Sequence, residues 1–236
     1  MYTNIDPREG ITVIEKFFNK FDPGDHNHLL NDLLSLVMRN NVFRFGQSYW
    51  KQHIGTAMRT PRACIYGTLF YACHEISTIL PKYQKNLLLY KHFIDNIFGV
   101  WTVDPNQPSA WSEFKRDLDR VSKLTWETSD LQSSVNGLDL TVTIAKNGSI
   151  LICTFQKDVN LFLYMLSHSA HPPGLLQSLV YGMMKTYREQ NSNWHDFTET
   201  LSLFYSRLLA RRYTQDKLKD VFLSAAAKLD THPKTN

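Results

Sequence analysis

Two apolar runs of strand type meet at a pair of polar residues near the middle of the chain, and this pattern constrains the fold most. The runs are residues 87–94 and 97–101, and Asp95 and Asn96 stand between them. Asp and Asn are common in tight turns, so the pattern predicts an antiparallel hairpin. In a second interpretation the hairpin also holds the Asp95 carboxylate at a sheet edge, where a cation could reach it. Both interpretations place Asp95 at a hairpin tip.

Apolar residues recur at helical spacing before this hairpin. Residues 11–37 predict two helices, the second with a fuller apolar stripe made of Leu29, Leu30, Leu33, Leu34 and Val37. Pro61 fits the first turn of a third helix, and Pro81 is expected to end it. The buried face predicted for that helix comprises Ile65, Leu69, Ala72, Cys73, Ile76 and Leu80. A short aromatic hairpin is predicted for residues 43–50.

In the rest of the chain, segments with apolar residues at helical spacing alternate with segments that have the alternating pattern of strands. An amphipathic helix is predicted for residues 111–121, followed by strands at 138–144 and 150–155. The Asn147-Gly148 pair between these strands favours a type I′ hairpin turn. From Gly174 onward the apolar spacing predicts three helices. The fold class expected from this order is α+β.

The composition is that of an ordinary folded protein, with 236 residues, 43% hydrophobic residues and a net charge of +4. It excludes disorder, collagen and coiled coil. No run approaches the roughly 18 apolar residues of a membrane helix, and the first residues lack a signal-peptide pattern. We therefore expect an intracellular protein, nuclear or cytoplasmic. Three cysteines without Cys-x-x-Cys spacing disfavour a disulfide framework or a zinc site.

Several short motifs follow one another in an order that makes them specific together, although each is weak alone. They are Tyr2-Thr3-Asn4-Ile5, Asn40-Asn41-Val42-Phe43-Arg44-Phe45, residues 49–58 (YWKQHIGTAM), residues 90–98 (YKHFIDNIF), Leu138-Asp139-Leu140-Thr141, Phe155-Gln156-Lys157 and Ser169-Ala170-His171-Pro172. In this order the chain resembles the reverse transcriptase domain of Penelope-like retroelements. The resemblance runs from Tyr2 to about Ala226.

The resemblance implies a right-hand polymerase: a partial palm at residues 1–166, a helical thumb-like module at 167–229 and a tail at 230–236. Its activity would be RNA-directed DNA polymerisation, with an RNA template, a DNA primer and deoxynucleoside triphosphates as partners. Nucleotidyl transfer uses two metal ions held by carboxylates from adjacent strands. Mg²⁺ is the expected cofactor, with Mn²⁺ as an alternative, because it prefers hard oxygen ligands.

The resemblance also implies roles for individual residues. Asp95 matches the first Asp of the family's Tyr-Ile-Asp-Asp hairpin and would be a metal ligand, with Asn96 beside it in the catalytic motif. Gln52 and Gly55 match the segment that packs against template and incoming nucleotide. Tyr2 matches an aromatic residue that stacks beneath the sugar, and core packing is its alternative role. For Lys157 a phosphate contact and a plain exposed position at a strand end remain equally open.

Three departures from the family pattern lower the expected activity. The first catalytic Asp should lie five residues before Tyr2, upstream of Met1, so we expect an N-terminally truncated domain without fingers or first palm strand. Asn96 replaces the second Asp of the hairpin, and a neutral amide is a weaker ligand for a hard cation. Arg59 stands where the family usually has Gly. We therefore hypothesise a chain with little or no polymerase activity.

Two other function classes remain open from the sequence. One is a non-catalytic RNA- or DNA-binding module built on the same palm and thumb. The other is a folded helical protein without affinity for nucleic acid. A metal site at His168-x-x-His171 is disfavoured, because no Cys or acidic ligand stands nearby and Pro172 indicates a turn. Asp104 and Asp139 match no metal ligand of the family.

Overall fold

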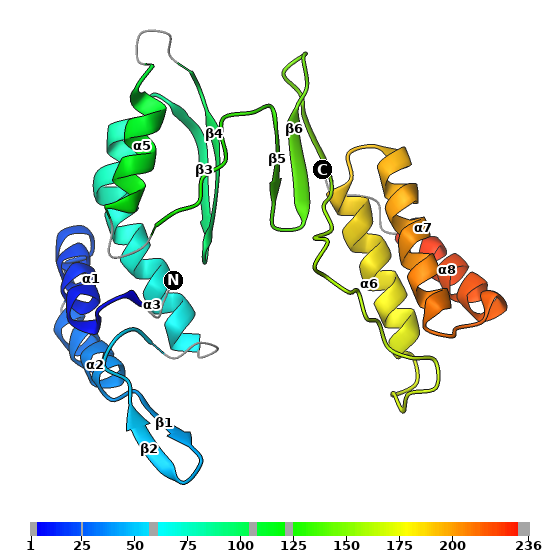
Figure 1. Ribbon diagram of the computed structural model, residues 1–236, viewed down its shortest axis with the longest axis horizontal. Helices are drawn as coiled ribbons and strands as arrows, with labels where there is room; N and C mark the ends of the chain where they lie inside the picture. Colours follow the sequence, from blue (N-terminus) through cyan, green and yellow to red (C-terminus); the bar gives the residue numbers. More distant parts are fainter. Residues whose placement is uncertain (1–3, 25, 57–60, 104–107, 121–124, 231–236) are drawn as a thin grey trace. The chain divides into compact units, whose positions relative to one another are not determined.

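The computed structural model describes residues 4–24, 26–56, 61–103, 108–120 and 125–230. The chain divides into two compact units, residues 1–131 and 132–236. Both units combine helices with small antiparallel sheets, as expected for the α+β class (Figure 1). The predicted palm, residues 1–166, covers the first unit and the strands of the second. The palm and thumb assignment itself stays a prediction.

The first unit begins with two helices, α1 (Pro7–Phe21) and α2 (Asn27–Arg39). Asp6 caps α1 by accepting a hydrogen bond from the backbone N–H of Arg8, and Pro7 suits the first turn. The helix predicted from the apolar stripe is present as α2, but most of the stripe is not covered, since Leu29, Leu30 and Leu33 are each about half exposed. The buried side chains of α2 are instead Asn27, Asn31 and Met38.

A continuous helical segment follows the β1 (Val42–Phe45) and β2 (Ser48–Lys51) hairpin. It consists of α3 (Pro61–His74), the π-helical turn η2 (Glu75–Ile79) and α4 (Leu80–Tyr83). The predicted stop at Pro81 is wrong, because the π turn restarts the helix and Pro81 then occupies its first turn, where a missing N–H costs little. The predicted buried face is also partly wrong. Ile65 and Ile76 are exposed, whereas Tyr66, Phe70 and Tyr71 are buried.

The hairpin of β3 (Leu87–Phe93) and β4 (Asn96–Trp101) completes the first unit together with α5 (Ala110–Asp119). Phe114 and Leu118 of α5 pack with Ile79 and Tyr83, and side chains of both strands lie against this cluster. A separate cluster joins α1, α2 and α3 around Ile11, Ile14, Tyr66 and Phe70. Trp126 packs against both clusters.

The second unit begins with a three-stranded antiparallel sheet, β5 (Ser134–Gly137), β6 (Leu140–Ile144) and β7 (Ile150–Thr154). A turn at Asn147-Gly148 joins β6 to β7 as predicted, but the type I′ geometry is wrong: only Gly148 has a left-handed φ, of +82°, and Ala145 bonds to Ser149 across a three-residue loop. The strand β5 was not predicted. Ser192, after α6, bonds twice to Ile152 of β7, which ties the free edge of the sheet to the helices.

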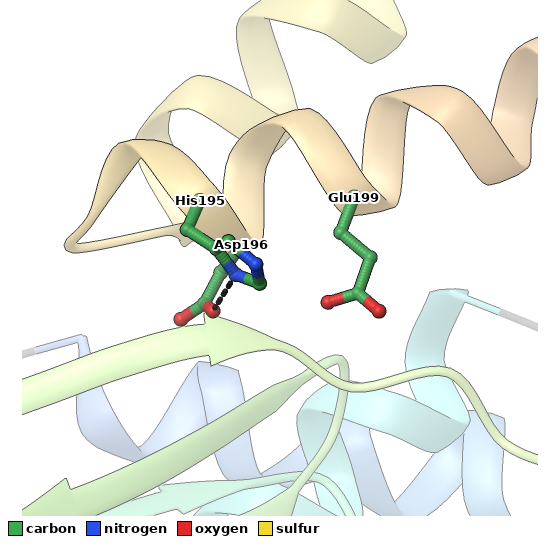
Figure 2. A group of neighbouring side chains, drawn as sticks. All are labelled: His195, Asp196 and Glu199. Atoms are coloured by element: carbon green, nitrogen blue, oxygen red, sulfur yellow. Dashed lines mark ion pairs between the residues drawn. The ribbon is translucent and has the colours of Figure 1, made fainter.

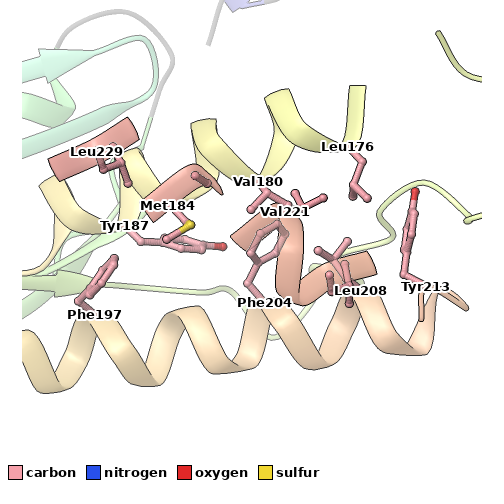
Figure 3. Close-up of a cluster of buried hydrophobic side chains, with 12 residues drawn as sticks. Leu176, Val180, Met184, Tyr187, Phe197, Phe204, Leu208, Tyr213, Val221 and Leu229 are labelled. Carbon is pink, nitrogen blue, oxygen red and sulfur yellow. The ribbon is translucent and has the colours of Figure 1, made fainter. Parts of the chain in front are cut away.

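The three predicted C-terminal helices are α6 (Leu175–Gln190), α7 (Trp194–Ala210) and α8 (Gln215–Asp230). Their core lies between facing helices (Figure 3), and its fully buried members are Val180, Phe204, Leu208 and Leu218. On α6 the buried side chains are Leu176, Val180, Met184 and Tyr187. No helix in the described ranges is long and apolar enough to cross a membrane.

Candidate functional site

Asp95 lies in the turn between β3 and β4, as predicted. The last cross-strand pair is Phe93 with Asn96, so the turn consists of Ile94 and Asp95, and Asn96 begins β4. The predicted turn centre is therefore one residue too late. Ile94 has a left-handed φ of +56°, an unfavourable conformation for a β-branched residue. Strain of this kind is maintained only where surrounding contacts enforce it.

A buried polar network below the turn supplies those contacts. Glu75 of η2 accepts hydrogen bonds from the Tyr90 hydroxyl and from Nδ1 of His92, both at 2.7 Å. The other ring nitrogen of His92, Nε2, lies 2.8 Å from the carbonyl oxygen of Ile94. Nε2 faces a carbonyl oxygen and Nδ1 faces the Glu75 carboxylate, so with Glu75 ionised both nitrogens donate and the imidazolium form of His92 is favoured. His92 thus links the π turn to the strained residue next to Asp95.

The charge state of His92 follows from the same contacts. Burial by itself would lower the pKa of His92, but the hydrogen bond and charge of Glu75 and the contacts with Ile94 and Asp95 together raise it above its ordinary value. Burial and the Glu75 carboxylate raise the pKa of Tyr90 as well, so its hydroxyl stays a donor. The sequence did not predict this network, because Glu75 lies 15 positions before Tyr90 and 17 before His92.

The hairpin tip offers two side-chain groups to a cation. Asp95 is exposed, and its Oδ1 accepts a hydrogen bond of 2.9 Å from the amide of Asn96. In the part of the chain that the structure describes, Asp95 belongs to no group of three or more candidate metal ligands. Two metal ions need more carboxylates than this tip provides. A single Mg²⁺ would take its remaining ligands from phosphates and water, so the predicted cofactor stays a prediction.

Gln52 and Gly55 have structural contacts in this fold. The Gln52 side chain accepts a hydrogen bond from Asn41 at 2.9 Å and donates one to the carbonyl of Ile54 at 2.8 Å. Arg62 of α3 donates to the same Asn41 side chain at 3.0 Å. Gly55 is buried with a φ of +70°, and its N–H bonds to the carbonyl of Ile5. These contacts hold the segment after β2 against the rest of the unit, and the predicted nucleotide contacts stay predictions.

The remaining predicted residues fall elsewhere. Lys157 is exposed in the loop after β7, in the second unit, where its carbonyl accepts a hydrogen bond from Asn160. Tyr2, Arg59 and Asp104 lie outside the described residues. His168 and His171 are exposed in the loop before α6.

The β1–β2 hairpin, whose aromatic content was predicted, carries a concentration of exposed aromatic side chains, and this exposure was not predicted. Phe43 and Trp50 form a cross-strand pair, and Phe45 follows on the same face, because positions two apart share a face. Trp50 is 56% exposed and Phe45 77% exposed. In a folded protein aromatic rings of this size are usually largely buried. An exposed group of them is therefore a candidate binding surface.

Basic side chains occupy the opposite face of this hairpin. Arg44 and Lys51 lie there with Tyr49, which is cross-strand partner of Arg44. The surrounding sequence reinforces the positive charge: residues 33–74 contain Arg39, Arg44, Lys51, Arg59 and Arg62 and no Asp or Glu. This uninterrupted absence of acidic residues is the signal by which the surface could have been found. We call Phe43, Arg44, Phe45, Tyr49, Trp50 and Lys51 the hairpin surface.

One further group of potential ligands lies at the start of α7. His195, Asp196 and Glu199 have side-chain atoms within 4.8 Å of one another (Figure 2). Asp196, however, completes a helix cap: its N–H donates to Asn193, and its carboxylate accepts from the Asn193 amide. The positive end of the helix dipole also disfavours a cation here. Helix capping accounts for this arrangement.

Comparison of the chain with protein-family models, with curated proteins and with solved structures finds no match.

Proposed function

We propose that this chain is a nucleic-acid-binding domain of the reverse transcriptase kind, which binds single-stranded RNA or DNA and does not by itself catalyse nucleotidyl transfer. The observation that carries the proposal is the hairpin surface, where exposed aromatic rings and cations share four-residue strands. The resemblance of the ordered motifs to Penelope-like reverse transcriptases supports the same class of partner.

Single strands are the form of nucleic acid that this surface suits. Unpaired bases stack on exposed aromatic rings, each worth about 1–3 kcal/mol, and cations contact the backbone phosphates. Phe43, Phe45 and Trp50 supply rings on one face of the hairpin, and Arg44 and Lys51 supply charge on the other. A strand passing over the hairpin edge would contact both faces. Because no carboxylate occurs between Asp32 and Glu75, nothing in this segment repels the phosphates.

Binding without catalysis follows from the ligands available at the β3–β4 tip. Asp95 and Asn96 offer one carboxylate and one amide, and nucleotidyl transfer requires two ions aligned with the attacking and leaving oxygens. The tip is nonetheless held in place by the Glu75–His92 network, which is consistent with an inherited polymerase hairpin. A polymerase activity remains the second candidate, and the Asp95 carboxylate is the observation that favours it.

Two assays on the same preparation distinguish the candidates. Fluorescence anisotropy with a labelled single-stranded RNA should show binding that weakens as salt increases, because phosphate contacts release counterions. Primer extension on an RNA template with Mg²⁺, and then Mn²⁺, should give no product. Extension that Asp95→Ala abolishes would establish the polymerase instead. Absence of any salt-dependent RNA binding would reject both.

A further inference from the structure

A groove in the first unit lies apart from the hairpin surface and shares no residue with it. It has a volume of about 330 Å³, and its walls come from one face of α1, from α3 and η2, and from Arg120 after α5. The residues that line it are Glu9, Val13, Lys16, Phe17, Lys20, Phe21, Phe70, Cys73, His74, Ser77, Thr78 and Arg120. This volume is within the usual range for sites of small ligands.

The charge in the groove is predominantly positive. Lys16, Lys20 and Arg120 line it against one carboxylate, Glu9. Lys16 and Lys20 are four residues apart on α1 and therefore share a face, an arrangement of like charges that destabilises a helix. Neither lysine forms an ion pair with any described residue. Arg120 bonds to Asp117 through one nitrogen, which leaves other N–H donors for a ligand. An anion would relieve this repulsion.

Apolar rings form a second part of the same groove. Phe17 and Phe21 lie with their ring centroids 4.6 Å apart, and the Lys20 ammonium lies 5.0 Å from the Phe21 centroid. Phe21 is half exposed, although it belongs to a helix whose other apolar residues pack inward. A flat aromatic ligand would cover this exposed ring and contact Phe17. The groove therefore combines an anion-binding part with an aromatic part.

The opposite wall presents polar side chains to the groove. Ser77 and Thr78 come from η2, and π-helical turns occur frequently at functional sites. His74 also lines the groove, and its buried Nε2 has no hydrogen-bond partner among the described residues. Burial lowers the pKa of His74, against the charge of Glu75 and against the backbone contact and charge of Asp117, so the neutral ring is favoured. Buried polar atoms normally have partners, and a bound ligand would supply one here.

We propose that this groove binds a small phosphorylated aromatic molecule of the nucleoside monophosphate class. A phosphate monoester carries about two negative charges and three acceptor oxygens. It therefore matches the three cations and two hydroxyls of the groove better than a carboxylate ligand would. The ring lies against Phe17 and Phe21, and a ligand hydroxyl or amino group reaches His74. This site is independent of the proposed binding of single strands by the hairpin surface.

Isothermal titration calorimetry of the full chain with AMP, adenosine and inorganic phosphate tests the proposal. AMP should bind saturably. Adenosine lacks the phosphate and inorganic phosphate lacks the aromatic ring, so each should bind at least about tenfold more weakly than AMP. Lys16→Gln with Lys20→Gln should weaken AMP binding about tenfold or more through the loss of charge-assisted hydrogen bonds. Lys85→Gln, an exposed lysine outside the groove, is the matched control and should leave the affinity unchanged.

The variants are conservative and exposed, so circular dichroism should show unchanged folding in each. Equal affinities for AMP and inorganic phosphate would overturn the aromatic half of the site. No saturable AMP binding, or binding that the double variant leaves intact, would overturn the site as a whole. Single-stranded RNA binding measured on the same double variant should remain, which separates failure of this site from failure of the hairpin surface.

Discussion

His92 and Glu75 form a buried ion pair, with Nδ1 of His92 2.7 Å from Oε1 of Glu75 and both side chains less than 10% exposed. The pair joins the π turn η2 to the β3–β4 hairpin, and the second nitrogen of His92 contacts the strained Ile94. The position of Asp95 therefore depends on a side chain that lies three residues before it in the strand and on a carboxylate in a helix.

Glu75→Gln should destabilise the first unit strongly. The substitution leaves the buried imidazolium of His92 without its counter-charge, and breaking a buried pair in this way costs about 3–5 kcal/mol. The pKa of His92 should fall at the same time, since Glu75 is the main group that raises it. Urea unfolding measures the first effect and NMR titration of the imidazole the second. A stable variant with an unchanged His92 titration would contradict the charged assignment.

The stability of the first unit should also depend on pH in a defined direction. Because the folded pKa of His92 is raised, its contribution is complete below the unfolded value of about 6.5 and is lost as pH rises through the folded pKa. Tyr90 and Asp95 also face His92, but Tyr90 stays neutral throughout this range because its pKa is raised. His74, beside Glu75, titrates below its ordinary value.

Unfolding free energies of the native chain and of His92→Gln, measured from about pH 6 to pH 9, test this direction. The difference between the two proteins should shrink as pH rises, because the native chain loses the His92 contribution and the variant never had it. A constant difference across this range would show that His92 is neutral in the fold.

The contribution of Asp117 to stability should depend on pH in the direction opposite to that of His92, because it is lost at acidic pH. Its carboxylate accepts from Lys82 at 2.6 Å and from the Tyr83 hydroxyl at 2.8 Å, and the hydrogen bond from Lys82 is the main cause that lowers its pKa. Stability from Asp117 is present above its ordinary pKa and is lost as pH falls through the lowered one. Asp117→Ala should cost about 1–3 kcal/mol, since it leaves the buried Tyr83 hydroxyl without an acceptor. Asp119→Ala would be a poor control, because Asp119 accepts a hydrogen bond from the backbone N–H of Trp126. Asp158 is exposed, so Asp158→Ala serves as the control.

Two glycines should respond to alanine in opposite directions. Gly148 has a φ of +82°, so Gly148→Ala should destabilise the β6–β7 turn by about 1–2 kcal/mol despite open space around it. Gly182 lies inside α6 with no atom within 4 Å of an added Cβ, so Gly182→Ala should stabilise by about 0.5–1 kcal/mol. Thermal unfolding of both variants measures the two changes in stability. Equal changes would show that the backbone conformation of the glycine does not decide the effect of alanine.

Local features of this fold were predictable and long-range ones were not. The Asn147-Gly148 turn and the β3–β4 hairpin follow from residues adjacent in sequence, and both are present. The apolar stripe at Leu29 and Leu33 predicted a helix correctly, but periodicity does not say which neighbour covers a face, and that stripe is exposed. Apolar residues surround α3 on all sides, so its buried face could not be read from spacing.

The candidate site likewise has one part that was predictable from local sequence and parts that depend on long-range packing. Asp95 was expected at a hairpin tip because turn chemistry is local. The Glu75–His92 pair depends on the packing of η2 against the hairpin, and the groove on the packing of α1 against α3, which no short motif encodes. The hairpin surface could have been recognised from the absence of Asp and Glu in residues 33–74.

Lys51→Gln should change how RNA binding depends on salt. If Lys51 contacts one phosphate, its removal lowers the slope of log K against log salt by about 0.7 for a single strand. Lys91→Gln, an exposed lysine of β3 outside the hairpin surface, is the matched control and should leave the slope unchanged. Anisotropy titrations at several salt concentrations measure both variants, and identical slopes would remove Lys51 from the interface.

The most direct test of the hairpin surface compares two exposed tryptophans. Trp50 is 56% exposed in β2, and Trp194 is 71% exposed at the start of α7, so neither Trp50→Ala nor Trp194→Ala removes a core residue. Single-stranded RNA affinity, measured by anisotropy at fixed salt, should fall about fivefold or more in Trp50→Ala through the loss of base stacking. It should stay unchanged in Trp194→Ala. Equal affinities in the two variants and the native chain would contradict the proposal that this hairpin binds nucleic acid.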